Sequence, residues 1–349
     1  MSWLARLLVE HWYRPRPTWL AYVLLPFSIL YSVVVEIRAS LYRHGFLRSE
    51  TLAVPVIVVG NVTVGGTGKT PFVIALVKAL RARGFTPGVI SRGYGGSVSA
   101  RHEIACVTAE SNPNEVGDEA MQIARTDTPM AIGRNRVAAG ELLLKTYPEV
   151  NVIISDDGMQ HYRLARTMEI AMLDGMRRLG NGLTLPSGPL RERPSRLAQV
   201  SAVVLTDIDS TTPLPQYQPP VFRQTLRADT LHQINQPENT MPLTALIDEN
   251  HIHAIAGIGN PERFFQMFYC AGIHIEPHAF ADHFPFTAND LALPDARWVI
   301  MTEKDAVKCR AFADDRCWYL PVTSEIAPPL LHLIDVKLRH AKKNKSKTA

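Results

Sequence analysis

The stretch VPVIVVGNVTVGGTGKT, residues 54–70, decides the fold expected for this chain. Its first part, Val54–Val59, is a continuous apolar run, which is typical of a strand buried on both faces in a parallel sheet. Its last part, Thr63–Thr70, leads directly into Thr70–Arg83, a segment with helical apolar spacing. A buried strand, a glycine-rich turn and a helix in this order predict a phosphate-binding loop in an α/β protein.

The loop offers several groups to a nucleotide phosphate. Its glycines let backbone N–H groups close around phosphate oxygens, and the following helix adds the positive end of its dipole. Lys69 can reach the β- and γ-phosphates, and the Thr70 hydroxyl can hold Mg²⁺. The usual pattern has glycine where Thr63 stands, and the alternative is a glycine-rich turn with a chance Lys-Thr pair. The strand–loop–helix context favours nucleotide binding by Thr63, Val64, Gly65, Gly66, Thr67, Gly68, Lys69 and Thr70.

The chain continues as an alternation of strands and helices. We expect strands at Gly88–Ser91, Val152–Ser155, Glu169–Leu173 and Ala202–Thr206, and helices at Asp118–Arg125 and Asn135–Tyr147. After a proline-rich linker, further strands are expected at His251–Ile258, Arg297–Met301 and Trp318–Val322, and helices at Pro261–Ala271, Lys304–Phe312 and Pro328–Arg339. This pattern predicts a P-loop NTPase-like, doubly wound α/β fold.

The composition shifts along the chain predict four segments. They are an N-terminal helical segment (1–48), a P-loop domain (49–215), a smaller C-terminal α/β domain (216–340) and a basic tail (341–349). The proline-rich stretch Thr211–Pro220 is the best candidate for the linker between the two α/β domains.

The overall composition excludes several classes of protein. Of the 349 residues, 46% are hydrophobic and 20% are charged, which excludes bulk disorder and collagen-like or coiled-coil architecture. The four cysteines form no C-x-x-C pair, which argues against a disulfide scaffold or a zinc ribbon. A formal net charge of +4 is mild, so we expect no nucleic-acid partner.

The N-terminal segment contains an uncharged apolar run, Thr18–Val35, with Pro26 in its middle. Its length is at the lower limit for spanning a bilayer, and tryptophan and tyrosine cluster around it as they do at membrane interfaces. A cleaved signal peptide fits poorly, because the run starts late and no small-x-small site follows it. The alternative is a buried core helix. We expect a membrane-associated helix, with spanning and interfacial arrangements both open.

Two acidic motifs follow the loop in the sequence. In VIISDDGMQH, residues 152–161, an apolar strand ends in Asp156 and Asp157, where a P-loop protein places the acid that positions Mg²⁺. The alternative is a solvated Asp-Asp-Gly turn. In GDEA, residues 117–120, Asp118 and Glu119 open a helix, and the motif alone favours helix capping.

Two further segments carry charged groups. PLRERP, residues 189–194, could clamp phosphate or form an ordinary charged loop, and the sequence leaves both open. FADHFPF, residues 280–286, places Asp282 and His283 among aromatics, where an acid–base role is plausible. The chain offers no compact set of zinc ligands, so solvated or core histidines are favoured at His251, His253, His274, His278 and His283.

Several motifs occur in a fixed order along the chain, namely NVTVGGTGKTP, SRGYG, GDEA, DDGMQH, GPLRE, AGIGNPERF, FxDHxxF and TEKDAVK. Together with the apolar N-terminus, they resemble the tetraacyldisaccharide 4′-kinase family, the lipid A 4′-kinases of Gram-negative bacteria. The resemblance runs from the N-terminal helix to about Lys308. It implies transfer of the γ-phosphate of ATP, with Mg²⁺, to the 4′-hydroxyl of tetraacyldisaccharide 1-phosphate. It also implies a location at the cytoplasmic face of the inner membrane, with the lipid substrate and the membrane surface as partners and no protein partner inferred.

The same resemblance implies roles for individual residues. Asp118 would be the catalytic base, with His283 as its dyad partner and Asp282 nearby. Lys69 and Thr70 would serve ATP and Mg²⁺. Asp156 and Asp157 would handle Mg²⁺ and the reacting centre, and Glu192 would support the metal or the phosphate. Arg191, Tyr94 and the pair Glu303–Lys304 are weaker assignments.

Three other functions remain open at this point. A membrane-associated P-loop switch ATPase also uses GGxGKT, but it places a signature lysine where this chain has Val64. A GTPase fits less well, because the guanine-specific pattern [NT]-K-x-D is displaced in TEKD, residues 302–305. A non-enzymatic nucleotide-binding scaffold would bind ATP and be unaffected by Asp118→Asn.

Overall fold

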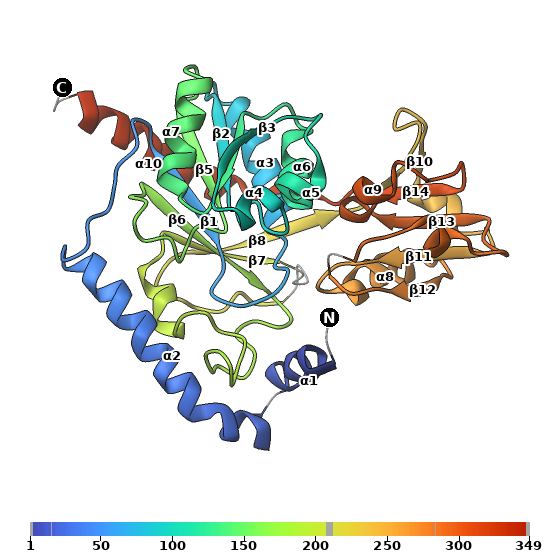
Figure 1. The fold of residues 1–349 in the computed structure, drawn as a ribbon, viewed down its shortest axis with the longest axis horizontal. Helices are drawn as coiled ribbons and strands as arrows, with labels where there is room; N and C mark the ends of the chain where they lie inside the picture. The colour runs from blue at the N-terminus through green and yellow to red at the C-terminus, as the bar shows by residue number, and fades with distance from the viewer. Residues whose placement is uncertain (1–2, 15, 207–211, 283, 347–349) are drawn as a thin grey trace.

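The structure is a computed structural model that describes residues 3–14, 16–206, 212–282 and 284–346, and it contains two mixed sheets (Figure 1). The predicted α/β class and the second, smaller sheet are confirmed. The expected strands and helices are all present, and apart from the last helix their ends lie within three residues of the predicted ones. The last helix, α10 (Pro328–Ser346), runs seven residues beyond its predicted end at Arg339 and so includes most of the predicted basic tail (341–349).

The first sheet has nine strands in the order β15-β8-β7-β6-β1-β5-β2-β4-β3. Seven neighbouring strands run parallel, and only the edge strands β15 and β3 pair in the antiparallel sense. Its strands are β1 (Val56–Gly60), β2 (Pro87–Ser91), β3 (Ile104–Val107), β4 (Met130–Gly133), β5 (Val152–Asp156), β6 (Met168–Asp174), β7 (Ala202–Thr206), β8 (Val221–Arg227) and β15 (Thr323–Ile326).

Hydrophobic cores cover both faces of this sheet, as a doubly wound arrangement requires. Alternate residues of β1 divide between them, with Ile57 and Val59 in one core and Val56 and Val58 in the other. The first core is closed by α3 (Lys69–Arg81), α6 (Asp118–Ala124) and α10 (Pro328–Ser346), and the second by α7 (Arg136–Thr146) and the 3₁₀ turn η1 (Pro194–Gln199). Two short helices, α4 (Ser97–Ala100) and α5 (Pro113–Val116), lie in the connections.

The second sheet has six strands in the order β10-β9-β14-β13-β11-β12. They are β9 (Thr230–Gln233), β10 (Thr240–Pro242), β11 (Ile252–Ala256), β12 (Glu276–Ala279), β13 (Trp298–Thr302) and β14 (Cys317–Leu320). The accompanying helices and turns are η2 (Leu243–Leu246), α8 (Pro261–Cys270), η3 (Ala288–Leu291) and α9 (Glu303–Cys309). Helix α8 packs with one core of this sheet, and residues of α9 pack with the other.

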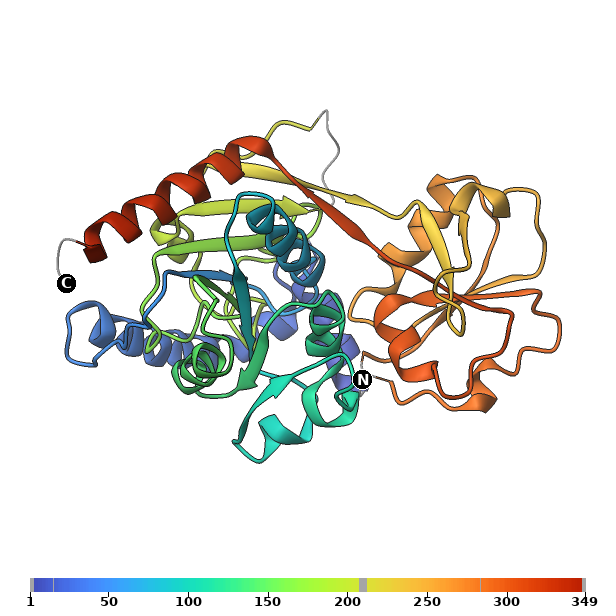
Figure 2. The same ribbon diagram turned by 90° about the horizontal axis from the view of Figure 1, so that it is seen from above.

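The chain crosses between the two sheets twice, after β8 and again before β15 (Figure 2). The structure therefore differs from the predicted boundary at residue 216, because β8 and β15 belong to the first sheet and α10 packs against its core. The residues of the proline-rich linker that the structure describes, 212–220, are irregular and lead into β8. Long-range pairing of β8 with β15 closes this edge of the sheet, which local composition does not reveal.

The helix after the loop begins where the local chemistry allows it. Gly68 precedes α3 with φ at 73°, a left-handed conformation that costs glycine little. Pro71 lies in the first turn, where a backbone N–H would have no helical partner. These two residues hold the N-terminus of α3 directly behind the loop.

Within the part of the chain described, one helix is long and apolar enough to cross a membrane, namely α2 (Trp19–Arg43). We call the nine-stranded sheet with its helices the first body and the six-stranded sheet with its helices the second body. Helix α2 lies along the outside of the first body, preceded by α1 (Trp3–Trp12) (Figure 1). Its buried positions are small, and Ser28 and Ser32 both contact the Thr184 hydroxyl, at 2.8 and 2.6 Å. The large apolar residues point away from the protein, including Trp19, Tyr22, Val23, Phe27, Ile29, Leu30, Val34 and Ile37.

Candidate active site

The phosphate-binding loop lies at the carboxyl end of β1, with Lys69 directed at two neighbours. The Lys69 ammonium donates to Asn61 Oδ1 at 3.2 Å and lies 3.6 Å from Asp157 Oδ1. Asn61 in turn donates to the carbonyl of Gly65 at 3.3 Å, so the loop and its lysine are held together. The Tyr13 hydroxyl also donates to the Val64 carbonyl at 3.0 Å, which joins the N-terminal segment to the loop.

Asp157 pairs with two cations beside the loop. Arg191 Nη1 donates to both of its oxygens, at 3.1 and 3.0 Å. Burial of Asp157 opposes ionisation, but the charges of Lys69 and Arg191 outweigh it and lower its pKa to about 2. Asp157 is therefore anionic at neutral pH and compensates both cations. The Tyr31 hydroxyl of α2 donates to the Arg191 carbonyl at 3.0 Å, so the apolar helix also braces this arginine.

Asp156 is in the opposite electrostatic state. It ends β5, which pairs in parallel with β1, so that Asp156 stands opposite Val59 in the register. Burial, reinforced by Glu119, raises its pKa to about 7 although Lys69 acts in the other direction. Its Oδ1 is buried, and no hydrogen-bond partner for it occurs among the described residues. A buried carboxylate oxygen of this kind beside a phosphate loop could serve as a ligand for a cation.

Glu192 is buried in a polar network on the same side of the sheet. Its carboxylate accepts from Gln160 Nε2 at 3.0 Å and from the Tyr162 hydroxyl, and Arg196 lies 3.7 Å away. Gln160 also donates to the carbonyl of Asn61 at 3.2 Å. Glu192 is thus linked to the loop through Gln160, which contacts the backbone of Asn61.

A cavity of about 370 Å³ opens over the loop, between the two sheets. The first body contributes Val64, Gly65, Gly66, Gly68, Lys69, Tyr94, Glu119, Asp157 and Arg191. The second body contributes Ile258, Gly259, Asn260, Arg263, Asp282 and Lys304. We call this the loop cavity.

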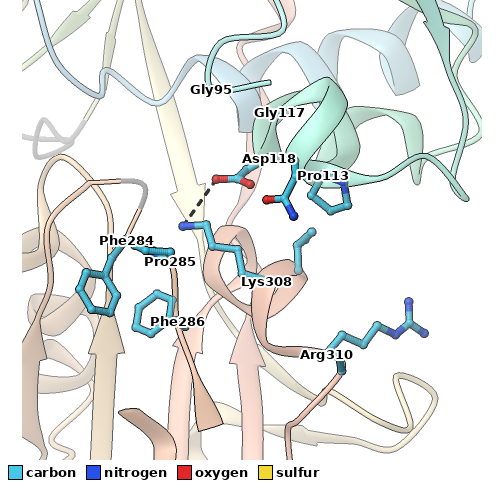
Figure 3. Close-up of a pocket in the computed structure, with 12 residues that line it drawn as sticks. Gly95, Pro113, Gly117, Asp118, Phe284, Pro285, Phe286, Lys308 and Arg310 are labelled. Atoms are coloured by element: carbon cyan, nitrogen blue, oxygen red, sulfur yellow. Dashed lines mark ion pairs between the residues drawn. The ribbon is translucent and has the colours of Figure 1, made fainter. Parts of the chain in front are cut away.

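A second cavity, of about 640 Å³, is lined by Asp118 and Lys308, whose carboxylate and ammonium lie 3.5 Å apart (Figure 3). Asp118 is the first residue of α6, and Lys308 lies in α9 of the second body. Lys308 is also 3.0 Å from Asp305 and lies 5.6 Å from the ring centroid of Phe286. We call this the acceptor cavity; it is also lined by Gly95, Pro113, Asn114, Gly117, Phe284, Pro285, Phe286, Val307, Arg310 and Ala311.

The two cavities share a wall. Glu119 lines the loop cavity while the preceding residue, Asp118, lines the acceptor cavity. On α9, Lys304 lines the loop cavity and Lys308, one turn later, lines the acceptor cavity. Gly117 makes this geometry possible: its φ is 93°, and a Cβ there would lie 2.4 Å from the Tyr94 carbonyl oxygen. The GDEA turn therefore requires glycine before its two acids.

Lys304 joins the two bodies electrostatically. Its ammonium lies 3.7 Å from Glu119 and 3.1 Å from Asp282. Burial opposes the charge on Lys304, but Glu119 and Asp282 outweigh it and raise its pKa. Lys304 therefore stays cationic at the mouth of the loop cavity.

The structure brings together most of the predicted residues. Lys69, Asp157 and the glycines of the loop line one cavity, and Asp156 lies behind them. Thr70 lines a smaller pocket that adjoins the loop cavity and shares Gly68, Glu119 and Lys304 with it. Asp118 lies in the adjoining cavity, where it pairs with Lys308 of another element; the N-cap of α6 is Gly117. His283 lies outside the described residues.

Sequence reasoning did not single out Asn61, Gln160, Arg263 or Lys308. Asn61 and Gln160 lie inside motifs that were noted, but their polar contacts run between distant segments. Arg263 belongs to the AGIGNPERF motif, and its guanidinium lies beside Gly68 at the loop. The motif could have pointed to Arg263, whereas the contact of Arg263 with the loop depends on how the two bodies pack.

Comparison with known proteins places the chain in a family. A family model for tetraacyldisaccharide-1-P 4′-kinase, LpxK, matches residues 20–339. The chain is 46% identical over 320 residues to the tetraacyldisaccharide 4′-kinase of Methylobacillus flagellatus, covering 90% of this chain and 91% of the relative. It is 44% identical over 340 residues to that of Chromobacterium violaceum, covering 96% and 98%.

A crystal structure supports the same assignment. LpxK from Aquifex aeolicus, solved in complex with ATP, matches with a TM-score of 0.76 at 29% identity, covering 91% of this chain and 99% of that chain. The match favours the kinase over the switch ATPase and the scaffold considered from the sequence. On these grounds the chain belongs to the tetraacyldisaccharide 4′-kinase family, the kinases of lipid A synthesis.

Proposed function

We propose that ATP binds with its terminal phosphates in the loop cavity and that the acceptor sugar enters the acceptor cavity. The reaction is the family's: phosphorylation of the 4′ position of tetraacyldisaccharide 1-phosphate with ATP. The observation that carries the arrangement is the shared wall, where Glu119 faces the nucleotide side and Asp118 faces the other. A phosphoryl group passing between the two cavities would travel a short path across this wall.

Two cations would be held in place to bind the phosphates, namely Lys69 and Arg191, both paired with Asp157. Charge spreads over the equatorial oxygens of the transferred phosphoryl group, so cations held in place stabilise the transition state. Asp157 holds both Lys69 and Arg191 at the loop before the nucleotide arrives. These cations need little reorganisation during the reaction, which is the advantage of a preorganised site.

Mg²⁺ would bind at Asp156, with the Thr70 hydroxyl and with support from Glu192. The fit rests on the unpartnered, buried Oδ1 of Asp156 and on an oxygen donor set that Mg²⁺ prefers. When bound, Mg²⁺ neutralises charge on the β- and γ-phosphates. The network of Gln160 and Tyr162 around Glu192 keeps this side of the loop rigid.

Asp118 would accept the proton of the attacking hydroxyl. A sugar hydroxyl loses its proton as it attacks phosphorus, and a carboxylate within hydrogen-bond reach accelerates this step. Lys308 orients the Asp118 carboxylate within the acceptor cavity (Figure 3). From the family resemblance, His283 would be the dyad partner of Asp118, with Asp282 nearby.

Helix α2 would attach the enzyme to the cytoplasmic face of the inner membrane. A helix of a soluble protein turns its apolar side inward, whereas α2 buries serines and exposes tryptophan, phenylalanine and leucine. Because the middle of α2 contacts Thr184, this arrangement favours lying in the interface over spanning. The lipid substrate would then reach the site without leaving the bilayer.

The test is incubation of the full chain with labelled ATP, Mg²⁺ and tetraacyldisaccharide 1-phosphate in mixed micelles. Transfer of label to the lipid supports the proposal. Release of free phosphate without labelled lipid, at the same rate with and without the lipid, would overturn it and point to an ATPase.

A further inference from the structure

A cluster of two histidines and two carboxylates lies on the edge of the second sheet, outside both cavities. The parallel pairing of β11 with β12 sets His253 opposite Glu276 and places His278 on the same side. His253 Nδ1 lies 2.9 Å from His278 Nε2 and 3.7 Å from Glu276 Oε2. Ligand atoms of all three residues lie within 4.8 Å of one another.

His253 is the centre of the cluster and is only 2% exposed. Its Nε2 is buried, with no hydrogen-bond partner in the part of the chain described. The nearest acid to it is Asp295, whose Oδ1 lies 3.6 Å away. Asp295 is also 4.0 Å from His251, which directly precedes β11. A buried imidazole thus has one nitrogen in the cluster and the other directed at a carboxylate.

We propose that this cluster is a zinc site, with His253 Nδ1, His278 Nε2 and Glu276 as ligands. Zn²⁺ bonds to imidazole nitrogen and carboxylate oxygen at ~2.0–2.2 Å, so tetrahedral ligand atoms lie roughly 3.3 Å apart. The two distances from His253 Nδ1, 2.9 and 3.7 Å, lie on either side of that value. Small side-chain movements bring all three atoms to the metal, and a water completes the tetrahedron.

Asp295 supplies the outer carboxylate that such sites use. A ligating histidine commonly donates its second ring N–H to a carboxylate, which sets the tautomer and the ring orientation. With Nε2 protonated and facing Asp295, His253 presents the Nδ1 lone pair to the cluster. His278 then carries its proton on Nδ1, which leaves its Nε2 lone pair for the metal. The hydrogen bond between the two rings is replaced by two bonds to the metal, and neither neutral ring loses a proton.

The ligand chemistry separates this site from the Mg²⁺ site beside the loop. Imidazole nitrogen suits Zn²⁺, whereas Mg²⁺ prefers oxygen ligands and keeps several waters.

The site would anchor β12, an edge strand with one parallel neighbour, to the buried strand β11. Strand β12 leads through Phe280 to Asp282, which faces the loop cavity, so the metal would fix the start of that segment.

The test is calorimetric titration of the metal-free full chain with zinc sulfate in excess Mg²⁺, which occupies the oxygen sites. We expect one Zn²⁺ per chain at this site and a higher unfolding midpoint with Zn²⁺. His278→Ala and Glu276→Gln, both near the surface, should each weaken binding at least tenfold. Asp295→Asn should weaken it by ~10- to 100-fold, as loss of an outer carboxylate does.

His274→Ala is the matched control, because His274 is exposed in the turn just before β12 and lies outside the cluster. It should bind Zn²⁺ as the wild type does. Wild-type protein that binds no Zn²⁺ in excess Mg²⁺ overturns the proposal. Equal affinity in the wild type, His278→Ala and Glu276→Gln also overturns it, since the metal would then be held elsewhere.

Discussion

The carboxylate of Asp118 lies 3.5 Å from the ammonium of Lys308, and this ion pair joins α6 of the first body to α9 of the second. The pair lies at the wall between the two cavities, so it holds the proposed base where the acceptor hydroxyl would arrive. The same contact makes the position of Asp118 depend on how the two bodies are packed.

Asp118→Asn removes the charge of the proposed base and keeps its shape. We expect kcat to fall by ~10²- to 10⁴-fold, the range for loss of a general base, with ATP affinity nearly unchanged. Initial rates and nucleotide titration measure the two effects separately. Glu115→Gln, on the neighbouring helix α5 and exposed, is the matched control and should keep wild-type rates. An active Asp118→Asn protein would remove Asp118 from the chemistry.

Asp118→Ala and His283→Ala test the dyad that the family resemblance implies. Groups that act as a unit show non-additive effects, so the double variant should be little slower than the worse single variant. Rates of all four proteins with the lipid substrate complete the cycle. Fully multiplicative losses would mean that the two residues act independently.

Lys69→Ala removes the cation that is aimed at the terminal phosphates. We expect kcat to fall by ~10²- to 10³-fold, as for other lost transition-state donors, with unchanged circular dichroism. Lys78→Ala is a useful control, because Lys78 is an exposed lysine on the same helix. Wild-type turnover by folded Lys69→Ala would contradict the phosphate site.

If Mg²⁺ binds at Asp156 as proposed, its binding should depend on pH near neutrality. Its pKa is raised to about 7, while the bound metal requires the carboxylate. Mg²⁺ binding at pH 7 should therefore release part of a proton, and apparent affinity should fall about tenfold between pH 8 and pH 6. Calorimetry in buffers of different ionisation enthalpy measures the proton. Asp156→Asn should abolish both effects.

The same raised pKa predicts how stability changes with pH without the metal. The folded state favours the protonated Asp156 carboxyl. This carboxyl therefore contributes fully to the stability of the folded state well below pH 4, and that contribution to stability is lost as pH rises through about 7. The neutral amide of Asp156→Asn avoids that loss. In EDTA at pH 8, the variant should unfold at a higher temperature than the wild type. The difference between the two unfolding temperatures should become smaller toward pH 5. A constant difference across this range would contradict the assignment.

Helix α2 should bind lipid surfaces through its outward apolar side. Val23, Phe27, Leu30 and Val34 are all more than half exposed. Burying one such side chain contributes ~1.5–3 kcal/mol, so changing all four to serine should reduce binding to anionic vesicles by much more than tenfold. Sedimentation with vesicles measures this. Ser28→Ala with Ser32→Ala, on the side that faces Thr184, should leave vesicle binding unchanged.

Local signals in the sequence were enough for the loop, its strand and its helix. The apolar run before the loop, the glycines and Pro71 act over a few residues, so periodicity and turn chemistry predict their structure. Asp156 and Asp157 were predictable as strand-end acids for the same reason. The motifs in order also led to the kinase family, and the comparisons confirm it.

Contacts between distant segments were beyond such reasoning. Strands β8 and β15 joined the first sheet because they complete its edge, although they follow the predicted linker. The residues of the proposed zinc site are scattered in the sequence, because Glu276 and Asp295 approach His253 only through strand pairing and a loop. Short isolated strands such as β4 carry too little pattern to be recognised.

The sequence by itself predicted the residues proposed to bind phosphate, and it determined where the first parallel strand lies and which helix is strongly apolar. Those properties depend on side-chain chemistry and on the geometry of neighbouring residues. Only the tertiary structure decided that Asp118 meets Lys308, that Asp157 holds Lys69 and Arg191 together, and that α2 turns its serines inward. Such pairings are set by the register and packing of whole elements, because burial of the combined apolar surface selects one arrangement among many.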